Sequence, residues 1–310
     1  MLKIGVQSAG WYKHEDALAS FAYIQSCGFD AVDFNIDHYL NTGKLDKEGI
    51  TETFFDQSTE DILAFFKPLK EASEKTGVEI AQMHAPFPCA FDDNEEVNAY
   101  IRMALEKCFA VCTYVGCPAI VVHPVGGAVR EEEYQKNLAL YRPLIPIIQK
   151  YPGVKICLEN IFTSRATRKT EGRFSNPDDA CRMLDQLNAE AGGDFFGFCL
   201  DVGHAALTGK NIRDFIRTLG HRLTVLHIHD NNALDDLHMI PYSYLANGST
   251  HVCDWQGFVD GLREIGYTGA LAFETFRIFS AYPAPVHTEA LRLIAAIGSY
   301  WKTQIETPAE

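Results

Sequence analysis

The chain has 310 residues, a formal net charge of −14, 47% hydrophobic residues and 22% charged residues. This composition is typical of a globular protein with a large core and argues against a disordered chain. Proteins that bind a nucleic-acid backbone usually present a strongly basic surface, so we expect no nucleic-acid partner. No apolar run approaches the roughly 20 residues of a membrane span, and no signal-peptide pattern begins the chain, so we expect no membrane partner.

Nine cysteines are present, an odd number without zinc-finger spacing. Cys157 and Cys199 lie inside apolar runs, where a thiol packs as a small hydrophobic group. We therefore expect reduced thiols and a cytoplasmic protein.

Short apolar runs alternate with amphipathic segments along the chain. The expected strands are Leu2–Gln7, Ala31–Asn35, Val78–His84, Ala119–His123, Val154–Glu159, Phe196–Asp201, Leu223–His229 and Ala270–Glu274. The expected helices are Glu15–Cys27, Thr59–Thr76, Asn94–Val115, Glu131–Lys150, Pro177–Ala191, Asn211–Leu219, Trp255–Ile265 and Pro285–Trp301. Eight strands that alternate with helices predict an α/β protein, a (β/α)8 TIM barrel, as a single domain over residues 1–310.

Three long loops follow expected strands, at His38–Gln57, Thr163–Asn176 and Asn231–Asp254. Loops of more than about a dozen residues are usually functional lids or disordered. In a barrel, loops that follow strands lie on the catalytic face. We expect Asn231–Asp254 to act as a lid over that face.

Six of the expected strands end in, or run into, a residue that binds metals. The residues are His84, His123, Glu159, Asp201, His227 and Glu274. Parallel strands closed into a barrel bring their carboxyl ends together, so we expect these side chains to converge. Glu159, Asp201, His227 and Glu274 are the predicted primary metal ligands, and an oxygen-rich set with one imidazole suits Mn²⁺, Mg²⁺ or Co²⁺, with Zn²⁺ as an alternative. The alternative interpretation is a buried polar layer satisfied by its neighbours, but converging carboxylates would then repel one another.

Further polar residues accompany this set. A second metal bridged by Glu159 would use His84 and His123, and a third would use His204 with Asp236 and His238. The alternative roles are hydrogen bonding, substrate binding or lid chemistry. His229 follows His227 by two residues, so both side chains face the same way, and His229 is a further candidate to bind metal or substrate.

Trp11 follows the first strand, where it would either line a sugar site or pack in the core. Arg165, in a basic segment with Arg168, could bind a phosphate or an acid group.

The motifs LEN at Glu159, DVGH at Asp201, LHIHDN at His227, DLHMIP at Asp236 and AFET at Glu274 resemble those of the xylose-isomerase-like TIM-barrel superfamily. That superfamily includes sugar isomerases and epimerases, inosose dehydratases and apurinic endonucleases of family 2. The resemblance spans all eight strand–helix units. It implies a single-metal ligand set of Glu159, Asp201, His227 and Glu274. It also implies that four further residues match the additional ligands of the three-zinc endonucleases, namely His84, His123, Asp236 and His238. The counterpart of His204 contacts substrate in the epimerases and metal in the endonucleases.

Two positions depart from the ketose 3-epimerases. Those enzymes carry a glutamate six residues after the first metal glutamate and an arginine six residues after the metal histidine. The present chain has Arg165 and Ala233 there. The motifs therefore indicate the superfamily without specifying 3-epimerisation of a free ketose.

The function predicted from these residues is a divalent-metal-dependent sugar or sugar-phosphate isomerase/epimerase, with Mn²⁺ favoured. The metal would stabilise an enediolate while Glu159 and Glu274 act as the acid/base pair. His204 and His229 would orient hydroxyls. The expected partner is a small carbohydrate, with a homo-oligomer possible. The alternatives are a multi-zinc apurinic endonuclease-like phosphodiesterase, an inosose-dehydratase-like lyase, and a metal-bound binding protein without turnover.

Overall fold

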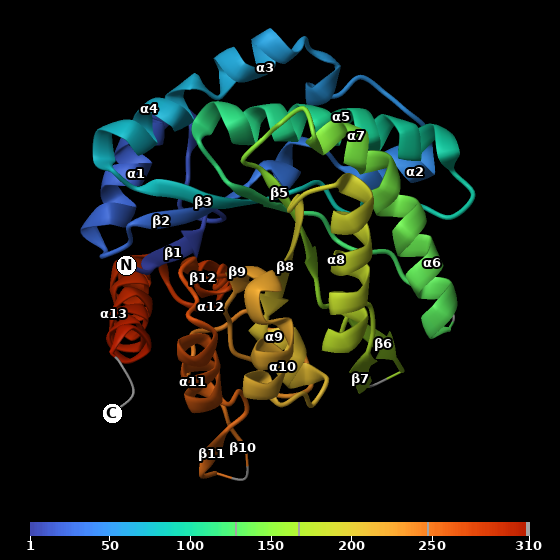
Figure 1. Cartoon of the computed structure of the whole chain (residues 1–310). Helices are drawn as coiled ribbons and strands as arrows, with labels where there is room; N and C mark the ends of the chain where they lie inside the picture. Colours follow the sequence, from blue (N-terminus) through green and yellow to red (C-terminus); the bar gives the residue numbers. More distant parts are fainter. Residues whose placement is uncertain (128, 167, 247, 308–310) are drawn as a thin grey trace.

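A computed structural model describes residues 1–127, 129–166, 168–246 and 248–307. Residues 128, 167, 247 and 308–310, which fall within the expected domain and two of its expected loops, lie outside the described residues. The chain forms a (β/α)8 barrel of eight parallel strands surrounded by helices (Figure 1), as predicted. The barrel strands are β1 (Lys3–Gln7), β2 (Ala31–Asn35), β3 (Glu79–His84), β4 (Ala119–Val121), β5 (Lys155–Glu159), β8 (Phe196–Asp201), β9 (Leu223–His227) and β12 (Ala270–Phe273).

The strand order is β12-β1-β2-β3-β4-β5-β8-β9, and every pairing in it is parallel. A bridge between Ile228 and Phe273 joins β9 to β12 and closes the sheet. The predicted strands agree closely with these bounds, but His123, His229 and Glu274 lie just beyond their strands. This position suits a functional residue, because a side chain beyond the last backbone hydrogen bond of its strand faces the barrel mouth.

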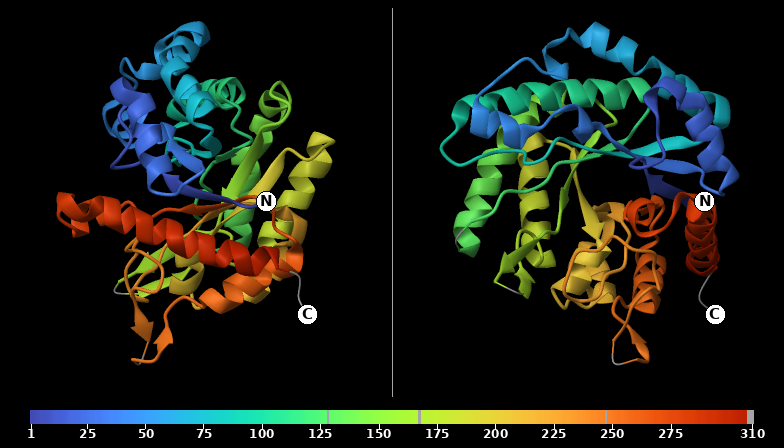
Figure 2. Two further views of the ribbon diagram at one scale, coloured as in Figure 1. Left: turned by 90° about the vertical axis from the view of Figure 1, so that its left-hand side faces the viewer. Right: turned by 180° about the vertical axis from the view of Figure 1, so that it is seen from behind.

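Helices cover the outside of the barrel, and the long α13 packs beside β1 near the amino terminus (Figure 2). Their bounds are α1 Ala17–Ser26, α2 Thr42–Glu48, α3 Thr59–Phe65, α4 Lys67–Thr76, α5 Glu95–Val115, α6 Arg130–Tyr141, α7 Ile145–Ile148, α8 Pro177–Ala191, α9 Val202–Leu207, α10 Ile212–Leu219, α11 Trp255–Ile265, α12 Ile278–Ala281 and α13 His287–Glu306. The predicted helix Thr59–Thr76 is divided at Phe66, one residue before the Lys67–Pro68 pair that opens α4. Pro68 has no backbone N–H to donate to the carbonyl four residues earlier, so the division has a local cause.

The alternation of side chains along each strand separates two apolar layers. On β8, Phe196, Phe198 and Leu200 join the core between strands and helices, whereas Cys199 joins a small cluster inside the barrel. Because side chains alternate with period two, Asp201 shares the inward face of Cys199. The same alternation turns Glu159 inward two residues after Cys157. The apolar barrel interior thus ends in a layer of ionisable groups.

Secondary structure is present inside the expected loops. An antiparallel hairpin of β6 (Phe162–Arg165) and β7 (Arg168–Glu171) occupies the loop after β5. The loop after β9 contains the hairpin of β10 (Leu245–Ala246) and β11 (Thr250–His251), which projects from the body (Figure 1). The short helix α9, which begins directly after Asp201, was not predicted from the sequence.

All nine cysteines are free thiols in the structure, and eight of them are buried, as expected from their apolar surroundings. Among the described residues, no helix is both long enough and apolar enough to cross a membrane.

Candidate metal centre at the barrel mouth

A cavity of about 470 Å³ opens at the carboxyl ends of the strands. Its lining includes Gln7, Asn35, His38, His84, Phe87, His123, Glu159, Phe162, His204, Asp236, His238, Glu274 and Phe276. Asp201, His227 and His229 are fully buried and make contact with the lining residues. The structure therefore brings together all ten of the metal-ligand candidates predicted from the sequence.

One group of ligand atoms surrounds Glu159. The Nε2 atom of His123 lies 2.7 Å from Oε2 of Glu159, yet each of these buried atoms lacks a partner in hydrogen-bond geometry. The rings of His84 and His123 meet edge to face, with centroids 4.5 Å apart. Ligand atoms of His84, His123 and Glu159 all lie within 4.8 Å of one another.

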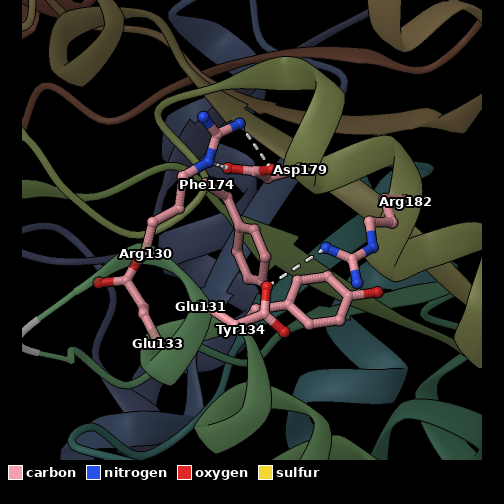
Figure 3. Close-up of a pocket in the computed structure, with 7 residues that line it drawn as sticks. All are labelled: Arg130, Glu131, Glu133, Tyr134, Phe174, Asp179 and Arg182. Carbon is pink, nitrogen blue, oxygen red and sulfur yellow. Dashed lines mark hydrogen bonds and ion pairs between the residues drawn. The ribbon is translucent and has the colours of Figure 1, made fainter.

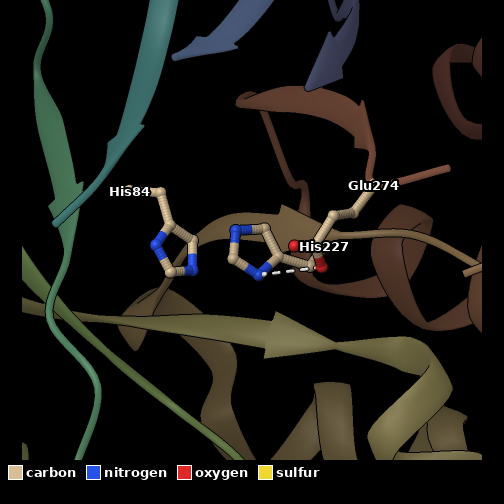
Figure 4. Close-up of side chains that lie close together, drawn as sticks. All are labelled: His84, His227 and Glu274. Atoms are coloured by element: carbon tan, nitrogen blue, oxygen red, sulfur yellow. Dashed lines mark ion pairs between the residues drawn. The ribbon is translucent and has the colours of Figure 1, made fainter. Parts of the chain in front are cut away.

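His227 connects this group to Glu274. Its Nδ1 atom lies 3.5 Å from Oε1 of Glu159 and 3.6 Å from Oε2 of Glu274. Figure 4 shows His84 and Glu274 approaching His227 from opposite sides. The second ring nitrogen, Nε2, lies 3.3 Å from Oδ2 of Asp33 on β2. An imidazole with a carboxylate behind it and two carboxylates in front is a common arrangement for a metal-ligating histidine.

A second group surrounds Asp201. The side chain of Asp201 caps α9 by accepting from the backbone N–H of His204, and His229 Nε2 lies 3.1 Å from the same carboxylate. Asp236, from the loop after β9, is 3.0 Å from His238 Nε2 and 3.4 Å from His204 Nε2. Ligand atoms of Asp201, His204 and His229 lie within 4.8 Å of one another, as do those of His229, His238 and Glu274.

In this cluster, the effect of neighbouring opposite charges on each pKa is contrary to the effect of burial. Burial raises the pKa of Glu159, but the charges of His123 and His227 outweigh it and hold that pKa well below its usual value. Burial lowers the pKa of His229, but Asp201 and Asp236 raise it to about 9. The pKa of His204 is raised well above its usual value in the same way, by Asp201, Asp236 and Glu159. The raised pKa values favour protons on His204, His227 and His229, which offset the charge of the carboxylates, whereas burial lowers the pKa of His123.

The donor set fits a divalent cation. Buried ligand atoms without a hydrogen-bond partner are concentrated here, among them Glu159 Oε2, His123 Nε2 and His227 Nδ1. Buried polar atoms are almost always hydrogen-bonded, so a group of orphaned atoms that face one another indicates an ion. Carboxylate oxygens with imidazole nitrogens are suitable ligands for Mn²⁺, Co²⁺ and Zn²⁺.

Two predicted substrate-binding residues lie outside the cavity lining. Trp11 is 6% exposed, donates from Nε1 to the carbonyl of Gln7, and packs edge to face on Phe21. This placement corresponds to the packing role that the sequence left open. Arg165 lies exposed at the end of β6. In the antiparallel register of the hairpin, its backbone lies opposite that of Arg168. Substrate contact by either residue stays a prediction.

Several site residues were missed from the sequence. Gln7 donates to Glu274 at 2.8 Å, and Asn35 and His38 line the cavity. Asp33 is 1% exposed inside an otherwise apolar strand. The available signal was a polar residue within or at the end of an apolar strand run, the same rule that identified the histidines.

An outer cavity of about 340 Å³ lies between α6 and α8 (Figure 3). Its charges are matched: Arg130 forms a bidentate pair with Asp179, and Arg182 lies 3.6 Å from Glu131 and over the ring of Tyr134. Paired charges on an exposed surface offer little free binding capacity.

The fold and this cluster define a class: a (β/α)8 barrel with candidate metal-ligating residues gathered at the carboxyl ends of its strands. Residues 21–297 match the family model described as the xylose isomerase-like TIM barrel, and the chain belongs to that family.

Individual proteins agree with this assignment. The uncharacterized protein MJ1311 of Methanocaldococcus jannaschii is 28% identical over 233 residues, which are 69% of this chain and 70% of that protein. The structure of 3-keto-D-glucoside 4-epimerase YcjR from E. coli is similar with a TM-score of 0.67 and 18% identity, over 98% of this chain and all of that chain. The IOLI protein with a bound zinc atom is similar with a TM-score of 0.64 and 15% identity, over 98% of each chain.

Proposed function

We propose that this protein is a divalent-metal-dependent sugar or sugar-phosphate isomerase/epimerase. The observation that carries the proposal is the arrangement of Glu159 and Glu274, two carboxylates from different strands that both face His227 Nδ1 within 3.6 Å. An isomerase that moves a proton next to a carbonyl needs a base and an acid at fixed positions around the substrate. Two proteins of similar fold have names that describe sugar epimerases, which supports the proposal.

The ion would be held by Glu159, Asp201, His227 and Glu274, with Mn²⁺ favoured. A divalent cation there would supply Lewis-acid polarisation of a sugar carbonyl and would compensate the charge that develops when the adjacent C–H proton is removed. The amide of Gln7 donates to Oε1 of Glu274, while Oε2 faces the Nδ1 atoms of His227 and His238. We propose that Glu159 and Glu274 remove and return the proton, and that His204 and His229 orient hydroxyls.

The wall of the cavity suits a sugar ring. Phe162 lies against His204, with ring centroids 4.9 Å apart, and Phe276 lies 4.5 Å from the ring of His238. Aromatic faces beside buried polar groups bind carbohydrates through their apolar C–H surfaces while hydroxyls reach the polar floor. They would also exclude water from the proton-transfer region.

The experiment has two stages. The purified protein is analysed for bound metal, stripped with a chelator and reloaded with Mn²⁺, Co²⁺, Mg²⁺ or Zn²⁺. A panel of keto sugars and their phosphates is then incubated in deuterated water and examined by NMR. We expect metal-dependent deuterium incorporation next to a carbonyl. A metal-loaded protein that exchanges no proton with any member of the panel would count against an isomerase/epimerase.

The His84–His123 and Asp236–His238 pairs favour one other candidate, a multi-zinc phosphodiesterase of the apurinic endonuclease type. That activity requires two or three bound metals and a nucleic-acid partner, and the net charge of −14 opposes the latter. Incision of an abasic duplex at catalytic rates, lost in His238→Ala, would replace the isomerase proposal. An inosose-dehydratase-like lyase would show the same deuterium exchange together with loss of water from the substrate.

A further inference from the structure

A second cleft of about 490 Å³ adjoins the metal-site cavity. The two share Phe87, half of whose side chain is exposed and whose ring lies 4.4 Å from that of His123. The cleft runs from Phe87 along the segment up to Phe91 and is lined on its other side by Pro124–Gly126, Leu140 and Arg173. The two cavities therefore meet at a single aromatic side chain.

Arg173 reaches into this cleft from the strand-5 side of the barrel mouth. Its backbone carbonyl accepts a hydrogen bond of 2.8 Å from Ile161, which is two residues after Glu159. Its guanidinium lies over Gly126, which is three residues after His123; a Cβ atom at Gly126 would stand only 2.9 Å from Nη2. Glycine at this position thus makes room for the guanidinium.

Among the described residues the guanidinium of Arg173 forms no ion pair within 4 Å and no hydrogen bond, although its charge lowers the pKa of the Glu133 carboxyl against the larger, opposite effect of burial. The Nε atom of Arg173 is buried and lacks a hydrogen-bond acceptor. The other cations that line the cleft are matched: Arg102 pairs with Glu95 at 2.5 Å, and Lys136 pairs with Asp92 at 2.9 Å. Among the described residues that line this cleft, Arg173 is therefore the cation that has a side-chain donor left for a ligand.

The position limits which part of a substrate can reach it. A chain rises at most about 3.3–3.6 Å per residue, so Gly126 lies within roughly 11 Å of His123, and Ile161 within roughly 7 Å of Glu159. These limits correspond to the length of one sugar with a terminal substituent. The guanidinium fork matches the geometry of a phosphate or a carboxylate and binds either through two parallel hydrogen bonds.

We propose that the cleft is an oxyanion subsite, in which Arg173 binds the phosphate or carboxylate of a sugar whose carbonyl end lies at the metal centre. The inference rests on the proposed function and specifies its substrate class as an acidic sugar. Phe87 separates the two subsites and packs against the carbon chain between them.

The test measures anion binding without metal or turnover, so that it can succeed even if the isomerase proposal fails. Chelator-treated protein is titrated with inorganic phosphate and, separately, with acetate, by ³¹P or ¹H NMR. Three variants are compared with the unaltered chain: Arg173→Gln, Gly126→Ala and the matched control Arg102→Gln. A hydrogen bond to a charged group contributes about 1.5–3 kcal/mol, so we expect Arg173→Gln to weaken binding of the preferred anion by about 10- to 100-fold.

Gly126→Ala leaves the arginine in place but displaces its guanidinium, so it should weaken binding as well; its φ angle requires no glycine. Arg102→Gln should change affinity less than twofold, because its charge is already paired and exposed. The preferred anion, phosphate or acetate, identifies the substituent. The subsite is ruled out if neither anion binds saturably, if Arg173→Gln binds as tightly as the unaltered chain, or if Arg102→Gln loses as much affinity as Arg173→Gln.

A second comparison places the subsite next to the metal centre. Affinities for D-fructose 6-phosphate and D-fructose are measured on the metal-loaded protein and on Arg173→Gln. We expect the phosphate to improve affinity at least tenfold in the unaltered chain and to lose that advantage in the variant. An advantage that persists in Arg173→Gln would place the phosphate elsewhere.

Discussion

Asp33→Asn should weaken metal binding although Asp33 is not among the proposed ligands. The Oδ2 atom of Asp33 lies 3.3 Å from Nε2 of His227, and both side chains are 1% exposed. Among the described residues, neither carboxylate oxygen of Asp33 has a partner in hydrogen-bond geometry, and the imidazole of His227 lies within ion-pair distance. A carboxylate in this position favours the tautomer with its proton on Nε2, which leaves the Nδ1 lone pair facing Glu159 and Glu274. Asparagine keeps the shape but can present an N–H to Nε2 and so favour the opposite tautomer.

Loss of such a supporting group typically lowers metal affinity 10- to 100-fold. We therefore expect the dissociation constant of Mn²⁺ to rise by that factor, which corresponds to about 1.4–2.7 kcal/mol. The measurement is isothermal titration calorimetry on chelator-stripped protein, supported by the visible spectrum of the Co²⁺ form. Asp30→Asn is the matched control, because Asp30 precedes the same strand at its opposite end and accepts from the backbone of Ile4. If Asp33→Asn binds Mn²⁺ as tightly as the unaltered chain, or Asp30→Asn loses affinity equally, the tautomer argument is wrong.

The remaining predictions concern catalysis, protons, the loop after β9 and the core. Glu274→Gln should reduce turnover more than it reduces substrate affinity, since the amide keeps shape but loses basicity; an unchanged kcat would refute the two-base scheme. Metal binding should release protons at pH 7 and strengthen as pH rises toward 9, because the raised pKa values of His204, His227 and His229 keep these rings protonated in the metal-free protein. By the same sign, the metal-free protein gains stability from the proton on His229 below about pH 6.5 and loses it as pH rises through about 9, so denaturation curves of the stripped protein should show falling stability over that range; calorimetry that detects no proton release at pH 7 would contradict the assignment. In the segment Asn231–Asp254, which supplies Asp236 and His238, amide protection against hydrogen exchange should rise when a substrate analogue binds; protection that is already high and unaltered by ligand would exclude a lid. Trp301→Ala should destabilise the fold by about 3–5 kcal/mol in denaturant unfolding, because the fully buried indole stacks on Trp255 and Phe273; a loss below about 1 kcal/mol would show that the site repacks.

The sequence alone was sufficient for the barrel and for the ten metal-ligand candidates. Apolar runs such as Phe196–Asp201 are continuous because both faces of a parallel strand are buried, and that pattern is local. Glycines such as Gly116 and Gly192 end helices with a left-handed residue, and this too is a local property. Polar residues that interrupt the apolar pattern at strand ends can therefore be assigned to the barrel mouth from the sequence alone.

The tertiary structure decided which of these residues face one another. His229 was predicted to face the same way as His227, but only the barrel closure shows it against Asp201 and His238. Asp33 and Gln7 come from strands far from His227 and Glu274 in sequence, so their contacts follow from strand order and register and from no local pattern. Arg173 rather than Arg165 reaches a cleft because the β6–β7 hairpin returns the chain to Ile161. Local propensity determines where a strand ends, whereas the partner of a side chain depends on non-local packing that composition and spacing do not encode.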